Sequence, residues 1–575
     1  MKKSLIHNIS FRVALSLLFL CTFQQETLRA QDQQRQLPGN PGETIELICD
    51  RSIYGVNEGI RYSANYHGPI ESAGLTWSKV LYVELIRWDG AKQALSIVLI
   101  KNNRAEGEII VPKNTPSGVY YLRAYTKWMR NYDPTYYAYI PLRILNPYSQ
   151  ELLGPPSTID SFQLLEYTDG KIDEDITFSG LKEQYESCEH AEFEIQLQEE
   201  LIPGRYTLSI AKTESLSSGA YSFAEKRTDK KPDSIEFLPE IEGLTLSGRI
   251  VDSETSVPTS GNKLQLSSYT NPFFFAEVSP AKDGSFIFTL PHFSIEPEFH
   301  LAEASNSPED PEDHLVLLSP QFCNKPIRLP YVPLSIDTTE KEIVRELLVN
   351  MQLKERFGIL AVSDRANDSN PSVPFYGSEA IITNVREYIE LTDLREAINE
   401  IIPQVTIRSG DSGEYLSIQG PSCLDIYPPL VLMDNVPVAN NTELLNIPSG
   451  RLKRIEVLNE AYMIGEFRYS GILSIFSNQN DMAGISLTGE HYFFDYQLLD
   501  SMLSMPEKQL DPCKSAHPNI RNQLYWESEI EFNEEGSFKV AFLTSEAPGQ
   551  YVITLRSFEQ ENGPGHFKKE LFSVK

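Results

Sequence analysis

A short motif that recurs three times constrains the fold of this chain more than any other feature. It consists of a glycine, one spacer residue and a tyrosine that leads into apolar residues at alternate positions. The copies lie at Pro116–Tyr125, Pro203–Ile210 and Pro548–Leu555. The glycine permits a tight turn, and the tyrosine begins a strand whose alternate side chains face a core. Strand-rich stretches separated by turn signals surround the first copy, as is typical of β-sandwiches. We therefore expect a mainly β protein with three related sandwiches, one for each copy.

Residues 1–30 are expected to be a signal peptide. Basic residues precede the apolar run Val13–Leu20, and Ala30 is a small residue suited to cleavage. Lipidation at Cys21 is a less favoured alternative, because the residue before it, Leu20, is large. No later apolar run reaches the roughly 18 residues of a membrane-spanning helix. The mature protein is therefore expected to be exported, and either soluble or peripheral to a membrane.

The charge of the chain excludes some classes of partner. Its 80 acidic and 50 basic residues give a formal net charge of −30. Such a balance repels nucleic acid and anionic membrane surfaces, and it favours basic partners or simple solubility.

The cysteines are far apart in the sequence. Five of the six lie beyond residue 30, at Cys49, Cys188, Cys323, Cys423 and Cys513. With about one cysteine in each expected domain, none can close a bridge within its own domain. We therefore expect buried free thiols.

The region around the first repeat resembles the macroglobulin-type domains of exported bacterial envelope proteins. Asp50–Tyr66 and Pro116–Asn131 carry this resemblance. We place the first sandwich at 31–145, a second macroglobulin-like one at 146–238 and a C-terminal one at 486–575. The Gly-Cys-Gly-Glu-Gln thioester sequence of complete macroglobulins does not occur, so the resemblance does not imply their covalent trapping chemistry.

A third kind of sandwich is expected at 239–330. Leu244–Pro258 and Lys282–Pro291 resemble the carboxypeptidase-regulatory-like domain, which is usually a spacer. Within the second of these stretches, Asp283 and Gly284 suit a tight hairpin connection that leads into an aromatic strand.

Helical patterns appear only after residue 335. Asp337 is a candidate N-cap with Glu340 three residues later, and apolar residues then recur at helical spacing to about Arg356. A second amphipathic helix is expected from Asp393 to Ile402. We place a helical linker and a different, α+β domain at 331–485.

The segment from about 380 to 478 resembles the plug domain of TonB-dependent receptors. The matching stretches are Leu391–Gly410, Pro428–Val438, Arg451–Asn459 and Gly465–Ser477. Where plugs usually carry Ala-x-Tyr-Gly, this chain has Glu-Phe-Arg-Tyr. A plugged barrel has about 22 strands of roughly ten residues each. The stretch after Ser477 is too short for that, so we expect a plug-like domain without its barrel.

These features predict a non-enzymatic accessory or adaptor protein associated with the outer membrane, on its periplasmic or cell-surface face. Its partner would be another envelope protein, such as a TonB-dependent transporter or an export pore, and no cofactor or metal is expected. The candidate partner contacts are Asp434, Asn435 and Pro437, which would form an exposed turn, together with Tyr469. The alternative for the turn is that it merely sets the register of a hairpin.

A second function remains open at this point. A macroglobulin-like protease-binding protein would need an exposed, cleavable bait segment, and the polar run Val362–Pro374 is the best candidate.

Other motifs favour structure over chemistry. Ser409–Tyr415 contains Gly-Asp-Ser-Gly, but no histidine lies in a protease-like setting, so a turn between two strands is expected. The histidines are scattered without metal-binding spacing. Four aromatic residues could line a carbohydrate platform, although aromatic residues in alternating strands more often fill cores. They are Trp88, Trp128, Tyr120 and Tyr125.

Overall fold

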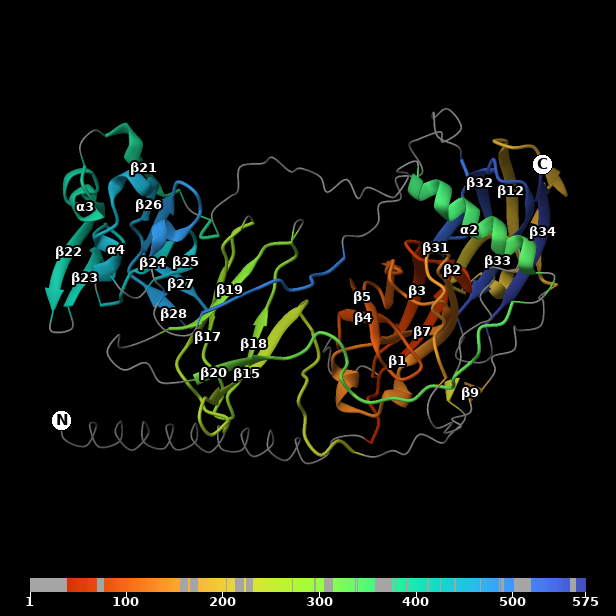
Figure 1. Ribbon diagram of the computed structural model, residues 1–575, viewed down its shortest axis with the longest axis horizontal. Helices are drawn as coiled ribbons and strands as arrows, with labels where there is room; N and C mark the ends of the chain where they lie inside the picture. The colour runs from red at the N-terminus through yellow and green to blue at the C-terminus, as the bar shows by residue number, and fades with distance from the viewer. Residues whose placement is uncertain are drawn as a thin grey trace, which may run out of the picture. The chain divides into compact units, whose positions relative to one another are not determined.

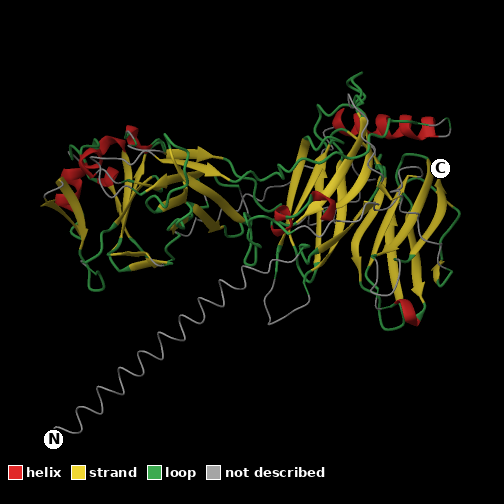
Figure 2. Ribbon diagram, turned by 90° about the horizontal axis from the view of Figure 1, so that it is seen from below, coloured by secondary structure: helices red, strands yellow, loops and turns green. Residues whose placement is uncertain are grey.

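A computed structural model describes residues 39–575 with several gaps, and it divides into two compact units. The longer gaps are 70–76, 156–163, 166–173, 213–221, 224–230, 305–313, 357–374, 501–518 and 559–564, and a few shorter ones occur elsewhere. The first unit comprises residues up to Ile241, Asn324–Ile359 and Met502–Lys575, and the second comprises Glu242–Cys323 and Leu360–Ser501. Strands dominate both units (Figures 1 and 2), which confirms the prediction of a mainly β protein.

The first sandwich lies where it is predicted. One sheet has the order β1 (Thr44–Cys49), β3 (Gly59–His67), β6 (Arg104–Ile110). The other has the order β2 (Ile53–Gly55), β8 (Ala138–Leu145), β7 (Gly118–Tyr125), β4 (Val80–Ile86), β5 (Lys92–Leu99). Strands β4 and β7 are buried along their whole length. Two short 3-10 helices, η1 (Trp128–Asn131) and η2 (Pro134–Tyr136), connect β7 to β8.

A single second sandwich contains both of the remaining repeat copies. Its smaller sheet has the order β10 (Ile176–Ser179), β12 (His190–Leu197), β32 (Ser537–Leu543). Its larger sheet has the order β11 (Gln184–Tyr185), β34 (Phe567–Val574), β33 (Gly549–Ser557), β13 (Tyr206–Lys212), β31 (Gln523–Ile530). A 3-10 helix, η3 (Glu199–Leu201), precedes β13. Two short strands of the same part of the chain, β9 (Leu164–Leu165) and β14 (Ser222–Phe223), pair with each other.

The predictions of separate sandwiches at 146–238 and 486–575 are therefore wrong. Strand β13, which holds the second repeat copy, pairs directly with β33, which holds the third. The two segments also share one hydrophobic core, in which Ile195 and Leu208 lie with Val540 and Ile553. The reason is physical: the few strands of either segment leave an apolar face that must be buried against another sheet.

Helix α2 (Glu340–Arg356) confirms the predicted helix but not its domain. Its buried Val344 and Leu347 pack against Ile53 and Leu145 of the first sandwich. From the same helix, Glu346 accepts a 2.6 Å hydrogen bond from Lys212 of the second sandwich. The helix thus contacts both sandwiches of the first unit (Figure 1) and is not part of an α+β domain at 331–485. Its candidate N-cap, Asp337, lies outside the described residues.

The second unit begins with the predicted sandwich at 239–330. One sheet has the order β18 (Ser285–Thr289), β15 (Thr245–Asp252), β20 (His314–Leu318). The other has the order β17 (Phe275–Val278), β16 (Leu264–Ser268), β19 (Phe299–Glu303), β30 (His491–Phe494). Asp283 and Gly284 do form a turn, with Gly284 at φ +75°. The turn does not connect a hairpin, however, because β17 and β18 belong to different sheets.

The α+β domain follows in the second unit. Its mixed sheet has the order β21 (Ile381–Asn384), β26 (Leu452–Leu458), β29 (Ile472–Ser477), β24 (Leu430–Met433), β25 (Val436–Pro437). Two hairpins, β22 (Val405–Gly410) with β23 (Gly413–Ile418) and β27 (Tyr462–Ile464) with β28 (Phe467–Tyr469), complete the strands. The helices are α3 (Leu394–Ile401) and α4 (Asn441–Leu445), with single 3-10 turns η4 (Val385–Glu387), η5 (Ser449–Arg451) and η6 (Met482–Gly484).

Helix α3 forms as the sequence predicts. The side chain of Asp393 caps it by accepting a 2.9 Å hydrogen bond from the backbone N–H of Glu396. Its Leu394, Ala397 and Ile398 are buried, and they lie on one face of the helix because of their spacing.

Candidate interaction site

The turn at Asp434 and Asn435 is buried. Strands β24 and β25 are joined by these two residues, both with positive φ (+47° and +66°), which is the geometry of a type I′ hairpin turn. Asp434 is 3% exposed, and its carboxylate accepts hydrogen bonds from Ser477 N (2.7 Å), Ser477 Oγ (2.6 Å) and Met482 N (2.8 Å). The prediction of an exposed turn is wrong, and the geometry matches a turn that sets hairpin register.

Pro437 and Tyr469 are also buried, within the second unit. Pro437 lies in β25, where both residues are buried. Burial, followed by the hydrogen bond and charge of Glu277 on β17, holds the pKa of Tyr469 well above its usual range. Two residues earlier in the chain, the ring centre of Phe467 lies 4.5 Å from Nζ of Lys263, which directly precedes β16. Tyr469 therefore contacts the sandwich of its own unit, a partner that local sequence patterns do not reveal.

Three exposed apolar side chains lie on two neighbouring segments of the α+β domain. They are Leu424, Ile426 and Met463, which are 47%, 81% and 70% exposed; we name them the apolar patch. Ser422 forms a parallel bridge with Glu460 and accepts a 3.1 Å hydrogen bond from Ala461 N. Farther along, the Tyr427 hydroxyl accepts a hydrogen bond from Arg468, which is the cross-strand partner of Met463. The segment 422–427 thus runs along the β27–β28 hairpin.

Among the described strands, an edge of the mixed sheet lies near the end of β26 that leads to Glu460. Strand β21 is an edge strand, and its Ile381 and Ile382 are 38% and 60% exposed. Ile381 pairs with Val457. Three residues after Val457, Glu460 forms the bridge with Ser422, which lies two residues before Leu424 of the apolar patch. Strand β21 contains neither lysine nor proline, which often protect edges. The opposite edge, β25, is only two residues long and contains Pro437.

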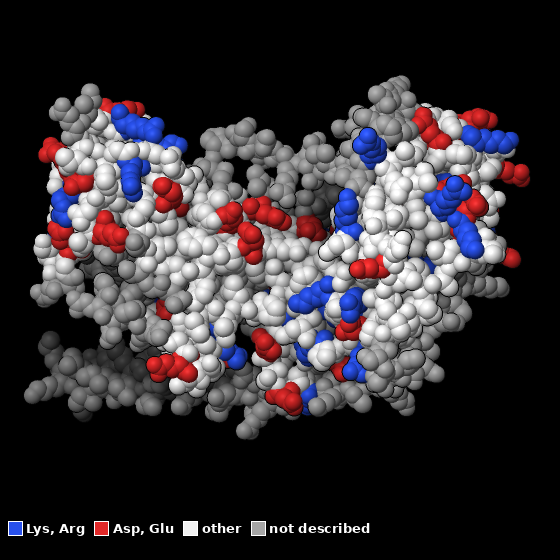
Figure 3. Space-filling model, in the orientation of Figure 1, with Lys and Arg blue, Asp and Glu red and all other residues white. Residues whose placement is uncertain are grey.

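The charged side chains visible in Figure 3 do not mark a second candidate binding surface. Acidic and basic side chains are interspersed over each unit there, despite the net charge of −30. That view shows no extended surface of a single sign that would favour a purely electrostatic partner.

The other predicted motifs have structural settings. Gly410 pairs with Gly413 at the end of the β22–β23 hairpin, so the Gly-Asp-Ser-Gly motif lies between two strands, as predicted. Its Asp411 and Ser412 lie outside the described residues. Tyr120, Tyr125 and Trp128 are buried, and Trp88 is half-buried with its ring edge-on to Tyr331. These four side chains do not form an exposed carbohydrate platform.

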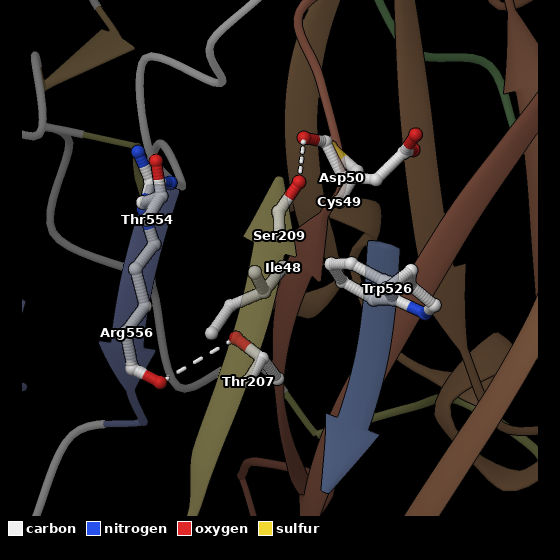
Figure 4. A pocket seen from close by; sticks show the side chains of 8 residues that line it. All are labelled: Ile48, Cys49, Asp50, Thr207, Ser209, Trp526, Thr554 and Arg556. Atoms are coloured by element: carbon white, nitrogen blue, oxygen red, sulfur yellow. Dashed lines mark hydrogen bonds between the residues drawn. The ribbon is translucent and has the colours of Figure 1, made fainter. Parts of the chain in front are cut away.

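A small cavity in the first unit lies along the seam between the two sandwiches (Figure 4). Ser209 Oγ donates a 3.1 Å hydrogen bond to the carbonyl oxygen of Asp50 across this seam. The cavity offers about 10 Å³ of space to the centre of a water molecule, which is room for about one water. Its lining consists of Ile48, Cys49, Asp50, Thr207, Ser209, Trp526, Thr554 and Arg556.

The cysteines differ in part from the prediction. Cys49 and Cys323 are buried thiols, as expected, and Cys423 is a half-buried thiol. Cys188 is disulfide-bonded, so the expectation of free thiols is wrong there. The spacing argument assumed that each domain is one continuous segment. A sandwich built from two distant segments can instead bring together cysteines that are far apart in the sequence.

Comparisons with solved structures find multidomain β proteins of bacteria. No protein-family model and no curated protein matches the sequence. The structure of a Salmonella alpha-2-macroglobulin reacted with methylamine is similar over 94% of this chain and 40% of its own, with 8% identity and a TM-score of 0.22. The structure of an Escherichia coli alpha-2-macroglobulin activated by porcine elastase is similar over 92% of this chain and 44% of its own, with 8% identity and a TM-score of 0.23. Dimeric latent PorU from Porphyromonas gingivalis is similar over 51% of this chain and 34% of its own, with 11% identity and a TM-score of 0.16. The chain spans less than half the length of these structures, and similarity at this level assigns neither family nor function.

Proposed function

We propose that this protein is a non-enzymatic adaptor of the cell envelope, and that its α+β domain binds another envelope protein. The observation that carries the proposal is the apolar patch of Leu424, Ile426 and Met463, together with β21, which is an edge strand among the strands that the structure describes. Clustered exposed apolar side chains are a common mark of protein interaction sites, whereas single ones are ordinary.

The two features suit one mode of binding. An extended segment of the partner can pair with β21 through backbone hydrogen bonds, while apolar side chains of the partner cover the apolar patch. Backbone pairing supplies affinity, and the side-chain contacts supply specificity.

Two observations support a location outside the cytoplasm. The N-terminal segment has the pattern of a signal peptide, and Cys188 is disulfide-bonded, which is rare in cytosolic proteins. Among the described helices, none is both long and apolar enough to span a bilayer. Association with the outer membrane, and a TonB-dependent transporter or export pore as partner, rest on the plug resemblance and belong to the proposal.

Affinity capture from detergent-solubilised outer membranes tests this function. The wild type should recover one envelope protein that a variant with Ile426→Ser and Met463→Ser recovers at least about tenfold less. Leu571→Ser, at an exposed apolar position in the first unit, serves as the matched control and should recover as much as the wild type. Equal recovery by all three proteins would contradict the proposal.

The macroglobulin-like alternative makes a different prediction. Its bait segment, Val362–Pro374, lies outside the described residues. Limited proteolysis separates the two functions, because a bait protein retains the protease after cleavage in this segment. Cleavage of this segment without retention of the protease favours the adaptor function.

A further inference from the structure

A short stretch of the first unit packs against four polar side chains of the first sandwich, and we name the surface that they form the groove. They are Tyr82, Lys127, Arg130 and Asn131. Residues 236–240, Glu-Phe-Leu-Pro-Glu, belong to no helix or strand, and we name them the linker segment. Phe237 is 4% exposed and Glu240 is 1% exposed, while Leu238 between them is 54% exposed. The linker segment thus places two specific side chains in the sandwich and leaves others in solvent.

Asn131 of η1 binds the backbone of the linker segment. Its Oδ1 accepts hydrogen bonds from Glu236 N (2.9 Å) and Phe237 N (3.0 Å), and its Nδ2 donates one to Phe237 O (2.6 Å). These three bonds recognise main-chain groups that any peptide offers, so Asn131 fixes the position of a peptide without regard to its sequence.

Cationic and hydroxyl groups bind the two buried side chains. The Arg130 guanidinium lies 4.0 Å from the centre of the Phe237 ring, a cation–π contact. Tyr82 donates a 3.1 Å hydrogen bond to Glu240, and Lys127 Nζ lies 3.8 Å from the same carboxylate.

The groove is lined by buried charged and amide groups. Arg130, Lys127 and Asn131 are buried beneath the linker segment. Buried charged groups contribute little net stability compared with well-packed apolar residues of similar size, because desolvation opposes their attraction. A backbone-binding amide combined with charge-specific contacts is, in contrast, the usual composition of a peptide-recognition site.

We propose that this groove is a peptide-recognition site that the linker segment occupies in cis. Its ligand in trans is a peptide of another protein that carries an aromatic residue and, three positions later, a carboxylate. The linker segment competes with this ligand at the high effective concentration of a tethered group, so the groove of the free protein is closed to weak ligands. The site lies in the first unit and does not depend on the adaptor function.

A full-length variant with Phe237→Ala and Glu240→Gln tests the proposal, because it removes the two buried side chains of the linker segment and leaves the groove residues unchanged. The probe is a fluorescein-labelled peptide with the sequence of residues 233–242, Asp-Ser-Ile-Glu-Phe-Leu-Pro-Glu-Ile-Glu. In fluorescence anisotropy, the variant should bind this peptide at least about tenfold more tightly than the wild type. A control peptide with alanine and glutamine at the two specific positions should not bind. Adding Asn131→Ala to the variant should abolish binding. Equal binding of both peptides, or no binding by the folded variant, would overturn the proposal.

Hydrogen exchange of the wild type decides the matter if that variant does not fold. Millimolar unlabelled peptide should accelerate exchange at the Phe237 amide, which Asn131 otherwise protects, while the control peptide should not. An unchanged exchange rate at Phe237 would overturn the proposal as well.

Discussion

The hydroxyl of Tyr551 donates a 2.8 Å hydrogen bond to the carbonyl oxygen of Ala547, four residues earlier in the chain. Tyr120 makes the same kind of bond to Pro116 at 2.9 Å, and Tyr206 makes one to Leu201 at 3.0 Å. The tyrosine of every repeat copy therefore closes the turn that precedes its own strand. Immunoglobulin-like sandwiches use a tyrosine in a comparable corner. The repeat indicates a local turn in a sandwich, not one sandwich per copy.

Tyr551→Phe should destabilise the first unit by about 1–2 kcal/mol. The substitution removes one hydrogen bond and leaves the carbonyl of Ala547, a buried residue, without this donor. Denaturant unfolding followed by tryptophan fluorescence measures the change. Tyr148→Phe, at a site of the same unit that is 46% exposed, should have almost no effect. Equal losses for the two variants would show that the corner bond contributes nothing.

Leu347→Ala should release helix α2 from the first unit. Leu347 is buried against the first sandwich, and truncation of a buried leucine costs about 2–5 kcal/mol. Hydrogen exchange of the α2 amides should accelerate, whereas Val349→Ala, at an exposed position of the same helix, should leave it unchanged. Unchanged exchange in Leu347→Ala would mean that α2 docks by its ion pairs alone.

Asp434→Ala should lower the stability of the second unit by about 2–4 kcal/mol. Three donors from Ser477 and Met482 would lose their acceptor, and buried unsatisfied groups cost about 1–3 kcal/mol each before relaxation. Thermal unfolding measures the loss. An exposed contact residue would behave in the opposite way, with stability intact and binding reduced.

The second unit should lose stability as the pH falls below about 6.5. His300 is buried, and its Nε2 lies 2.8 Å from Nδ1 of His491. Burial, and then the charge of His491, lower the pKa of His300 from 6.5 to about 3. Between pH 6.5 and pH 3 the unfolded chain therefore binds a proton at His300 that the folded chain does not bind. The contribution of His300 to the free energy of unfolding is thus fully present above pH 6.5 and declines toward pH 3. His300→Phe should flatten the pH dependence of the unfolding free energy between pH 7 and 4. A profile as steep as that of the wild type would assign the dependence to other groups.

Local signals in the sequence predict local structure well in this chain. Neighbouring residues determine three of these features, so sequence patterns predict them. They are the helix cap at Asp393, the positive-φ turn at Asp434 and the closely spaced strands of the first sandwich. The pairing of Tyr206 in β13 with Ser557 in β33 depends on residues more than three hundred positions apart, and no single-sequence pattern encodes it.

The predicted contact residues Asp434 and Asn435 are buried, and the site that we propose uses other residues of the same domain. Asp434 and Asn435 have the composition of an exposed turn, and tertiary contacts with Ser477 and Met482 bury the carboxylate. Ile426 and Met463 lie in short irregular or hairpin segments where periodicity does not separate exposed from buried positions.

Site-specific photocrosslinking in intact cells tests the proposed binding surface most directly. A photoreactive benzophenone amino acid at position 426 should yield one predominant covalent product with an envelope protein, and the same group at position 571 should not. The product at position 426 should also disappear when Met463→Ser is added. Absence of any product at position 426, or the same products at both positions, would contradict the proposal that this α+β domain binds its partner through the apolar patch.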